Sequence, residues 1–520
     1  MAVCLALSVR HNEGRLVYAL DDPYIHMAMA RNAAEHGVWG VTRYGFTSSS
    51  SAPLWTALLS LVYLASGPGE VAPLLLNLVF AVGLCSLAHA LLRRRGAPPL
   101  VSYATLALIV FASPLPAVIF CGQEHMLHAL LTMSFAWAAV VALSQRGGGR
   151  AGLLATVALA PLVTAARYEG LFAVLVVAIL LAVQKRWGSG ALVGAAGLAP
   201  VVGYGVLSVR EGWSFVPNPV LLKGNTPDFR SVDSALNFVY QGYRQTWHSP
   251  HIAVLVVGGL VALLVLLSRG RRIWEPEAAM VVVFLGTTGL HMQLAGTGWF
   301  FRYEAYLVSL GLLALGLAAT ELLAGQAPAA KARGPGAPRA LLVVLGLVLA
   351  SPFVLRGFES FRMTPRASGS IYDQQYQMGL FLRARYEGKT VAANDIGAIN
   401  YLADIRCVDL WGLANREAAR ARRAGRYGAK EAAEVARSQG AEIAIVYDEW
   451  FERAGGGKLD LWWEPVGQWR IPDRATTGGD TVSFYAVAPG EREALSASLR
   501  AFGPRLPGEV AQMGQYTEGE

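Results

Sequence analysis

Long apolar runs separated by short polar segments dominate the chain up to about residue 356. A helix of about 20 apolar residues crosses the hydrocarbon core of a membrane, and most of these runs are close to that length. We predict about ten membrane spans, over residues 71–92, 100–119, 124–144, 151–166, 168–184, 190–208, 252–268, 277–295, 304–323 and 340–356. Only Arg167 separates the runs 151–166 and 168–184, which are therefore either two tight spans or one interrupted element.

The overall composition agrees with a polytopic α-helical membrane protein. Of the 520 residues, 54% are hydrophobic and only 15% are charged, and the mean hydropathy is +0.39. Soluble domains usually contain about 25% charged residues. The four cysteines are scattered without metal-binding spacing, so they predict neither a disulfide framework nor a cysteine metal site.

Basic residues gather in alternate short loops between the predicted spans. These loop residues are Arg93–Arg95, Arg146, Arg150, Lys185, Arg186, Arg269, Arg271, Arg272, Lys331, Arg333 and Arg339. Cytoplasmic loops of membrane proteins carry such an excess, so the net charge of +8 reflects membrane orientation and predicts no nucleic-acid partner. The alternating connections then lie outside, at 21–50, 120–124, 167–169, 209–251, 296–303 and after 356.

This alternation has two consequences for the start of the chain. The apolar run 52–66 cannot be a full span, and we predict a half-inserted or interfacial helix there. In addition, a span must precede residue 21, yet residues 1–16 offer only a short apolar start without the basic region of a signal peptide. We therefore expect that an upstream first span is missing from this sequence.

The composition changes sharply after residue 357. Apolar runs of strand length appear at 390–393, 407–412, 442–448 and 481–487, and a charged, helical segment lies within 415–441. Strands that alternate with helices predict a small α/β domain. We divide the chain into a transmembrane domain, 1–356, and a C-terminal extracytoplasmic α/β domain, 357–520.

An acidic pair, Asp21 and Asp22, precedes Pro23 in the first outer loop. Proline suits the first position of a helix and aspartate suits its N-cap, so Asp22 is predicted to cap an amphipathic helix that ends at Gly37. Capping explains one acid and leaves Asp21 without a structural role.

Further ionisable residues occur in the other outer loops, where their position at membrane depth is costly and often marks a functional site. Each has a structural alternative, because glutamates at helix starts favour the helix dipole and arginines reach lipid headgroups. The set comprises Glu124 and His125, Arg167 and Glu169, Lys223, and Arg302 and Glu304.

Acids and bases together at the outer membrane surface suit a lipid-linked sugar phosphate as substrate. Arg167, Lys223 or Arg302 could bind the phosphate, an apolar groove could hold the isoprenoid, and Asp21 could deprotonate an acceptor hydroxyl. Displacement at the anomeric carbon by an acceptor activated in this way would invert its configuration.

Several segments resemble the GT-C superfamily of polytopic glycosyltransferases, closest to its arabinofuranosyltransferase-like and lipid A aminoarabinose transferase-like branches. The resemblance runs over nearly the whole chain, and the order of its motifs is specific. The matching segments are LDDPYIHMAMARNAAEHGVWGVTRYGFTSSSSAPLWTALLS (20–60), GQEH (122–125), RYEG (167–170), PNPVLLKG (217–224), RYEAY (302–306) and NDIGAINYLADIRCVDLWGLANRE (394–417).

The resemblance implies inverting transfer of a sugar from a polyprenyl-monophosphate donor to an extracytoplasmic glycan, lipid or protein acceptor in the bacterial inner membrane. The catalytic acid of the family falls on Asp21 or Asp22 within the loop 21–50. We favour Asp21, because the first acid of the pair is the base in similar enzymes and because Asp22 has the capping alternative. Some members use a divalent cation such as Mg²⁺ or Mn²⁺, and Asp22 is then an alternative ligand. The chain is expected to depart from the family in lacking a first span, and it departs in Ala52.

Glu124, His125, Glu169 and Glu304 are predicted to support this site. A transporter or flippase for a lipid-linked substrate would share the spans and buried charges, although no repeated half of the kind typical of transporters is evident. A membrane scaffold would leave the acidic pair unexplained. A transferase needs Asp21 or Asp22 to face Arg167, Lys223 or Arg302 across one cavity, whereas a transporter needs a path to the opposite side.

Overall fold

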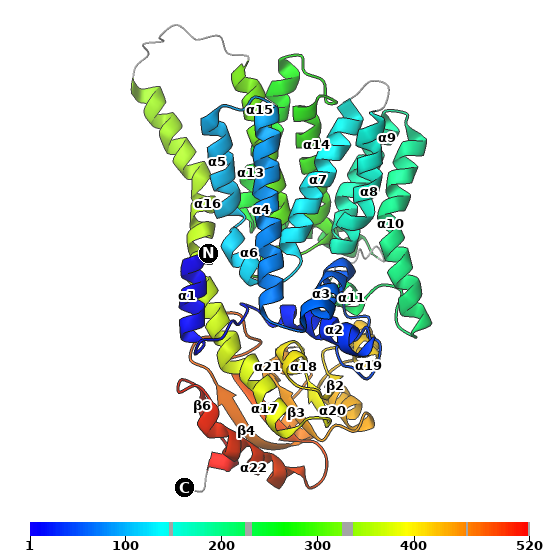
Figure 1. Ribbon diagram of the computed structural model, residues 1–520, viewed down its shortest axis with the longest axis vertical. Helices are drawn as coiled ribbons and strands as arrows, with labels where there is room; N and C mark the ends of the chain where they lie inside the picture. The colour runs from blue at the N-terminus through cyan, green and yellow to red at the C-terminus, as the bar shows by residue number, and fades with distance from the viewer. Residues whose placement is uncertain (145–148, 224–230, 325–335, 454–455, 518–520) are drawn as a thin grey trace.

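A computed structural model describes residues 1–144, 149–222, 231–324, 348–453 and 456–517, together with the backbone alone of residues 223 and 336–347. A bundle of long helices forms one end of the molecule, and a β-sheet with its covering helices forms the other end (Figure 1). The first loop of the chain lies between these two parts.

Six helices of the described chain are long and apolar enough to cross a membrane. They are α4 (Val71–Arg94), α7 (His125–Ser144), α10 (Trp187–Arg210), α13 (Pro250–Ser268), α14 (Pro276–Leu294) and α15 (Ala305–Ala324). The outward sides of α4, α10 and α13 expose leucine and valine, whereas α7, α14 and α15 are mostly buried in the bundle. The chain is thus a multi-pass membrane protein, as its apolar runs predict.

The other predicted spans are also helical, but three of them are shorter. They are α5 (Pro99–Ala112), α8 (Arg150–Ala166) and α9 (Gly170–Val183). The prediction of one continuous helix over 100–119 is wrong, and a separate α6 (Leu115–Phe120) follows α5. Pro114 has no backbone N–H to donate, and it disfavours the helical conformation at Ser113. Arg167 has extended backbone (φ −160°, ψ 141°), so 151–166 and 168–184 are two helices.

The last predicted span, 340–356, lies within a much longer helix, α16 (Gly336–Ile371). This helix leads into the π-helical turn η1 (Tyr372–Tyr376) and then α17 (Gln377–Arg385). The predicted domain boundary at 356/357 therefore falls inside a helix. The side chains of α16 become more polar near residue 357, but the helix continues through this position. The change in composition therefore does not coincide with the end of a structural element.

Five further helices precede or connect the bundle helices. Helix α1 (Ala2–His11) lies along α16, and α2 (Asp22–His36) packs on α3 (Pro53–Ser66) (Figure 1). The α3 helix matches the short apolar helix predicted for 52–66. The other two are α11 (Asn218–Lys223) and α12 (Val232–Trp247).

The C-terminal part contains a six-stranded sheet in the order β2-β1-β3-β5-β4-β6. Strands β2, β1 and β3 are parallel, and the remaining pairs are antiparallel. The strands are β1 (Thr390–Ala393), β2 (Arg406–Asp409), β3 (Ile443–Val446), β4 (Glu464–Arg470), β5 (Thr481–Ala486) and β6 (Ala511–Met513). The four predicted strands correspond to β1, β2, β3 and β5.

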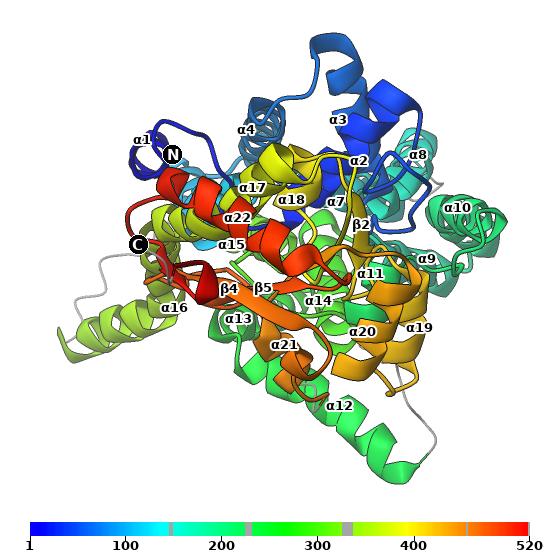
Figure 2. The same ribbon diagram turned by 90° about the horizontal axis from the view of Figure 1, so that it is seen from below.

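Helices cover both faces of this sheet. Phe381 of α17 packs edge-to-face on Trp469 and Phe484, and α20 buries its alanines against the opposite face. The small C-terminal α/β region is thus a three-layer unit, visible from below in Figure 2. Its other elements are α18 (Ala398–Leu402), α19 (Arg416–Arg423), α20 (Ala429–Ser438), α21 (Asp448–Arg453), η2 (Leu459–Leu461), α22 (Glu491–Phe502), η3 (Gly503–Arg505) and η4 (Gln515–Thr517).

Candidate active site

A cavity of about 500 Å³ lies where the helical bundle meets α2 and the C-terminal region. Its polar lining comes from loops that are far apart in the sequence. The ionisable lining residues are Asp22, His26, Glu124, Arg167, Glu169 and Arg302. The structure therefore brings one acid of the pair together with two of the three predicted phosphate-binding cations.

Arg302 links Asp22 to the rest of the site. Its guanidinium forms an ion pair with the carboxylate of Asp22 and donates a hydrogen bond to Gln123. The Arg302 side chain is only 2% exposed, and its Nε has no hydrogen-bond partner among the described residues. A buried guanidinium with an unused N–H donor is suited to bind an anionic ligand.

A strained turn presents Arg302 to the cavity. Trp299, Phe300 and Phe301 have φ values of +36°, +58° and +64°, a region that residues with side chains rarely adopt. Backbone strain of this kind persists only where surrounding contacts enforce it, and it is common at functional sites.

Glu304 helps to enforce this turn and does not line the cavity. Its carboxylate accepts a hydrogen bond from the Gly298 amide at 2.8 Å and pairs with Arg356 at 2.7 Å. Arg356 also donates to the Phe301 carbonyl at 2.9 Å. The predicted supporting role of Glu304 is therefore best understood as positioning of the loop that carries Arg302.

Arg167 is the centre of a second ionic cluster. Its guanidinium pairs with Glu124 and Glu169 and approaches His125 Nε2 at 2.9 Å. Burial raises the pKa of Glu169, but Arg167 outweighs this effect and lowers that pKa to about 2. Glu169 therefore stays ionised at neutral pH. His125 touches this cluster from outside the cavity lining.

Tyr303 connects the two arginines. The guanidinium carbons of Arg302 and Arg167 lie 5.0 Å and 5.6 Å from the centre of its ring, within the range of cation–π attraction. The ring therefore helps to stabilise two guanidinium groups within one small cavity. Tyr303 was not among the site residues predicted from the sequence.

Much of the remaining lining of the cavity is apolar. It is formed by Ile25, Leu171, Phe172, Val201, Val216, Val220, Leu221, Leu294 and Leu413. Most of these residues belong to the bundle or to α11, whereas Leu413 comes from the C-terminal region. A polar end next to an apolar wall suits an amphiphile.

The Leu413 turn is shaped by Asp409. The carboxylate of Asp409 accepts hydrogen bonds from the amides of Trp411, Gly412 and Ala414 at 2.7, 3.1 and 2.5 Å. The turn also contacts the first loop, because Ser49 Oγ donates to the Leu413 carbonyl at 2.9 Å. Both parts of the molecule thus contribute to the cavity.

Asp21 points away from the cavity and into the C-terminal region. Its two carboxylate oxygens accept hydrogen bonds from the amides of Gly397 and Ala398, at 2.6 and 2.7 Å. Burial, together with the neighbouring Asp395 carboxyl, raises the pKa of Asp21 well above its ordinary value. Asp21 therefore caps α18 of the C-terminal region.

The prediction that Asp22 caps its own helix is wrong. Helix α2 begins at Asp22 itself, its N-cap is Asp21, and no side chain caps the helix start. Asp21 occupies the N-cap position of α2, but its carboxylate accepts hydrogen bonds from amides at the start of α18 instead. Geometry thus favours Asp22 over the predicted Asp21 as the acid that could reach a substrate.

Lys223 cannot be assigned in the same way, because its side chain lies outside the described residues. Sequence reasoning also missed His26, whose Nδ1 lies 2.8 Å from Thr56 Oγ1. Burial lowers the pKa of His26, so this imidazole is neutral at pH 7. An i, i+4 position after Asp22 on one helix face was the signal that could have indicated it.

Asp22 forms an ion pair with the Arg302 guanidinium, and a second arginine, Arg167, lines the same cavity. Among the described residues, the group of three metal-ligating side chains with close ligand atoms is His11, Asp373 and Glu509, none of which lines the cavity. The metal role considered for Asp22 stays a prediction.

Comparison with solved structures identifies the fold. Two crystal structures of ArnT from Cupriavidus metallidurans match 94% of this chain and 97% of their own. The apo structure is 14% identical with a TM-score of 0.52, and the structure bound to undecaprenyl phosphate is 15% identical with a TM-score of 0.50. The chain has the ArnT fold. The sequence resemblance to the GT-C superfamily, to which ArnT belongs, is thereby confirmed for the fold.

Two other comparisons add little about activity. A family model described as a domain of unknown function, DUF8728, matches residues 368–485, from the end of α16 to β5. No curated protein matches the sequence.

Proposed function

We propose that this chain is an integral-membrane glycosyltransferase that uses a polyprenyl-phosphate sugar as donor. The main support is the cavity in which Asp22 faces Arg302 and Arg167 beside an apolar wall. The ArnT fold agrees with this proposal, since ArnT of Cupriavidus metallidurans has been crystallised with undecaprenyl phosphate.

The two arginines are proposed to bind the donor phosphate. Charge-assisted hydrogen bonds from guanidinium groups to phosphate are among the strongest in proteins, and they gain strength as negative charge develops on a leaving phosphate. The isoprenoid would lie along Leu171, Phe172 and Leu294, where burial of each methylene contributes about 0.8 kcal/mol.

Asp22 is proposed to act as general base. Its carboxylate takes the proton of an acceptor hydroxyl while the hydroxyl oxygen bonds to the anomeric carbon. The bond between this carbon and the phosphate oxygen breaks at the same time, and polyprenyl phosphate leaves with both electrons. Attack opposite the leaving group inverts the anomeric configuration. The active site is proposed to face the extracytoplasmic side, in agreement with the positive loops at the other end of the bundle.

The direct test is a transfer assay with the full chain in lipid nanodiscs. A panel of radiolabelled polyprenyl-phosphate sugars is offered together with extracted envelope glycans and lipids as acceptors. We expect one donor to be consumed, with release of polyprenyl phosphate and an inverted linkage in the product. A retained configuration would contradict the mechanism. Movement of an intact lipid-linked sugar between leaflets without transfer would favour the alternative of a flippase.

A further inference from the structure

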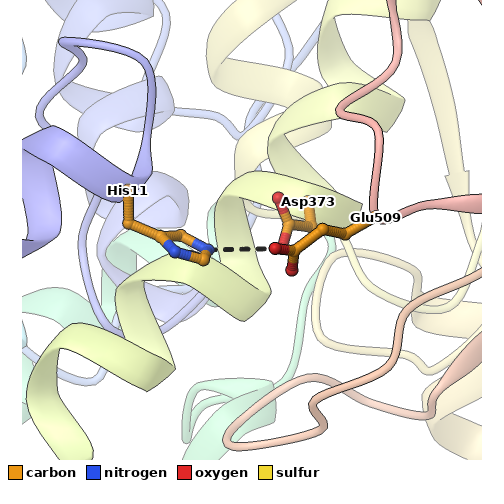
Figure 3. Close-up of side chains that lie close together, drawn as sticks. All are labelled: His11, Asp373 and Glu509. Atoms are coloured by element: carbon orange, nitrogen blue, oxygen red, sulfur yellow. Dashed lines mark ion pairs between the residues drawn. The ribbon is translucent and has the colours of Figure 1, made fainter.

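Three metal-ligating side chains from distant parts of the chain meet beside α1. His11 ends α1, Asp373 lies in the π-helical turn η1, and Glu509 lies between η3 and β6 (Figure 3). One imidazole nitrogen and two carboxylate oxygens all lie within 4.8 Å of one another. These residues play no part in the cavity described above.

The distances fit a small dication. His11 Nε2 and Asp373 Oδ2 are 3.5 Å apart. Neighbouring ligand atoms of a tetrahedral ion with bonds of about 2.1 Å are separated by about 3.4 Å. His11 and Asp373 therefore already have the required spacing, and a rotation of the exposed Glu509 side chain would bring its oxygen into the same range.

The structure holds His11 in place from several directions. An added Cβ at Gly369 would lie 2.5 Å from both Cδ2 and Nε2 of the imidazole, so the ring occupies space that only glycine leaves free. The next residue, Asn12, donates a hydrogen bond to Ser368 Oγ at 2.8 Å. Glu13 then accepts one from the Tyr372 hydroxyl at 2.9 Å. The end of α1 is thereby fixed against the helix that carries Asp373.

The two carboxylates of this cluster have no described Lys or Arg side chain that balances their negative charge. The Asp373 side chain is only 9% exposed, and the imidazole of His11 lies beside its carboxylate. Among the described residues, no Lys or Arg forms an ion pair with Asp373 or Glu509. A buried carboxylate is costly unless it is paired or binds a metal. The π-helical turn supports the same view, because such turns are frequent at functional sites.

From this geometry we propose that His11, Asp373 and Glu509 bind a first-row transition-metal dication such as Zn²⁺ or Mn²⁺. Imidazole together with carboxylates suits these ions, whereas Ca²⁺ and Mg²⁺ prefer oxygen ligands alone. The ion would join α1, the α16–η1 helix and the segment before β6. Its role is therefore to fasten the C-terminal region to the membrane part, and it does not depend on the proposed transferase activity.

The test measures metal binding to the full chain in detergent, after removal of any affinity tag and chelator treatment. We expect one Zn²⁺ or Mn²⁺ per chain, much weaker binding of Mg²⁺, and a rise in unfolding temperature on addition of the metal, because a ligand that binds only the folded state stabilises it. His11→Gln and Glu509→Gln should each weaken binding at least tenfold and abolish the rise in unfolding temperature.

The matched control is His36→Gln, since His36 is also a half-exposed histidine beside a carboxylate, that of Glu35 at 4.0 Å. This substitution should leave binding and the unfolding shift unchanged. The proposal is overturned if the wild-type chain binds less than one ion at micromolar metal. It is equally overturned if Glu509→Gln, which alters an exposed side chain, retains full binding. Neither readout requires catalysis.

Discussion

At the scale of residues, two adjacent acids have separate environments although the sequence presents them as a pair. Asp21 is bonded to two backbone amides of the C-terminal region, whereas Asp22 faces Arg302 in the cavity. The raised pKa of Asp21 resembles that of a catalytic acid, but a general base must first be within reach of its substrate. The position of the carboxylate, and not its pKa, therefore decides which aspartate is assigned as the base.

The raised pKa of Asp21 has a consequence for stability. An acid whose pKa is higher in the folded state contributes stability below its ordinary pKa, near 3.8, and loses this contribution as pH rises through the higher folded value. We expect the unfolding temperature of the wild type to fall, relative to Asp395→Asn, as pH rises from 4 to 8, because that substitution removes the repulsion. A difference that does not change with pH would contradict this assignment.

Tyr303 gives a second prediction at this scale. Two cation–π contacts of about 1 kcal/mol each should be lost in Tyr303→Leu, so affinity for undecaprenyl phosphate should fall roughly 10- to 30-fold. Tyr303→Phe keeps the ring and should stay within about threefold of the wild type. Binding can be measured by tryptophan fluorescence or by calorimetry in nanodiscs. Equal losses in the two variants would assign the effect to the hydroxyl group instead.

At the scale of elements, the contact between the start of α2 and α18 depends on Gly397. A Cβ at this position would lie 2.1 Å from the Asp21 carbonyl oxygen and 2.4 Å from its carboxylate. Gly397→Ala should therefore destabilise the chain by about 1–3 kcal/mol, as overpacking usually does. Gly45→Ala is the control, since nothing lies within 4 Å of its added Cβ. Thermal unfolding distinguishes the two, and similar melting temperatures would refute the role of this contact.

The sequence predicted most elements because their patterns are local. Apolar runs identified the bundle helices, and short apolar runs identified β1, β2, β3 and β5. Strand β4 was missed because Pro465 and Gly467 interrupt its pattern at an irregularity in the ladder, and the three-residue β6 carries too little signal. Pro114 could have indicated the break after Ser113. The apolar run over 100–119 continues across this position, however, and favoured one continuous helix.

At the scale of the whole molecule, the candidate site exists only where the two parts meet. Ser49 bonds to Leu413, Asn218 Nδ2 donates to the Gly412 carbonyl at 2.9 Å, and Arg31 donates to the Tyr401 and Asn400 carbonyls. Such contacts join residues hundreds of positions apart. Residue chemistry could therefore nominate Arg167, Arg302 and Glu124 from their loops, but it favoured Asp21 over Asp22, and the geometry favours the reverse.

The same limit explains the metal-ligating cluster. His11, Asp373 and Glu509 share no spacing that a sequence would reveal, because three separate elements supply them. The sequence offered Asp22 as an alternative cation ligand, and it gave no indication of the cluster beside α1.

The most direct test of the proposed function compares sugar transfer by two matched variants, Asp22→Asn and Asp21→Asn. If Asp22 is the general base, its substitution should lower the transfer rate by about 10²–10⁴-fold while undecaprenyl phosphate still binds and the unfolding temperature stays close to that of the wild type. Asp21→Asn should lower the unfolding temperature and leave the rate per folded molecule within about tenfold. Full activity in Asp22→Asn, with loss of transfer in a stably folded Asp21→Asn, would contradict the assignment and return the catalytic role to Asp21.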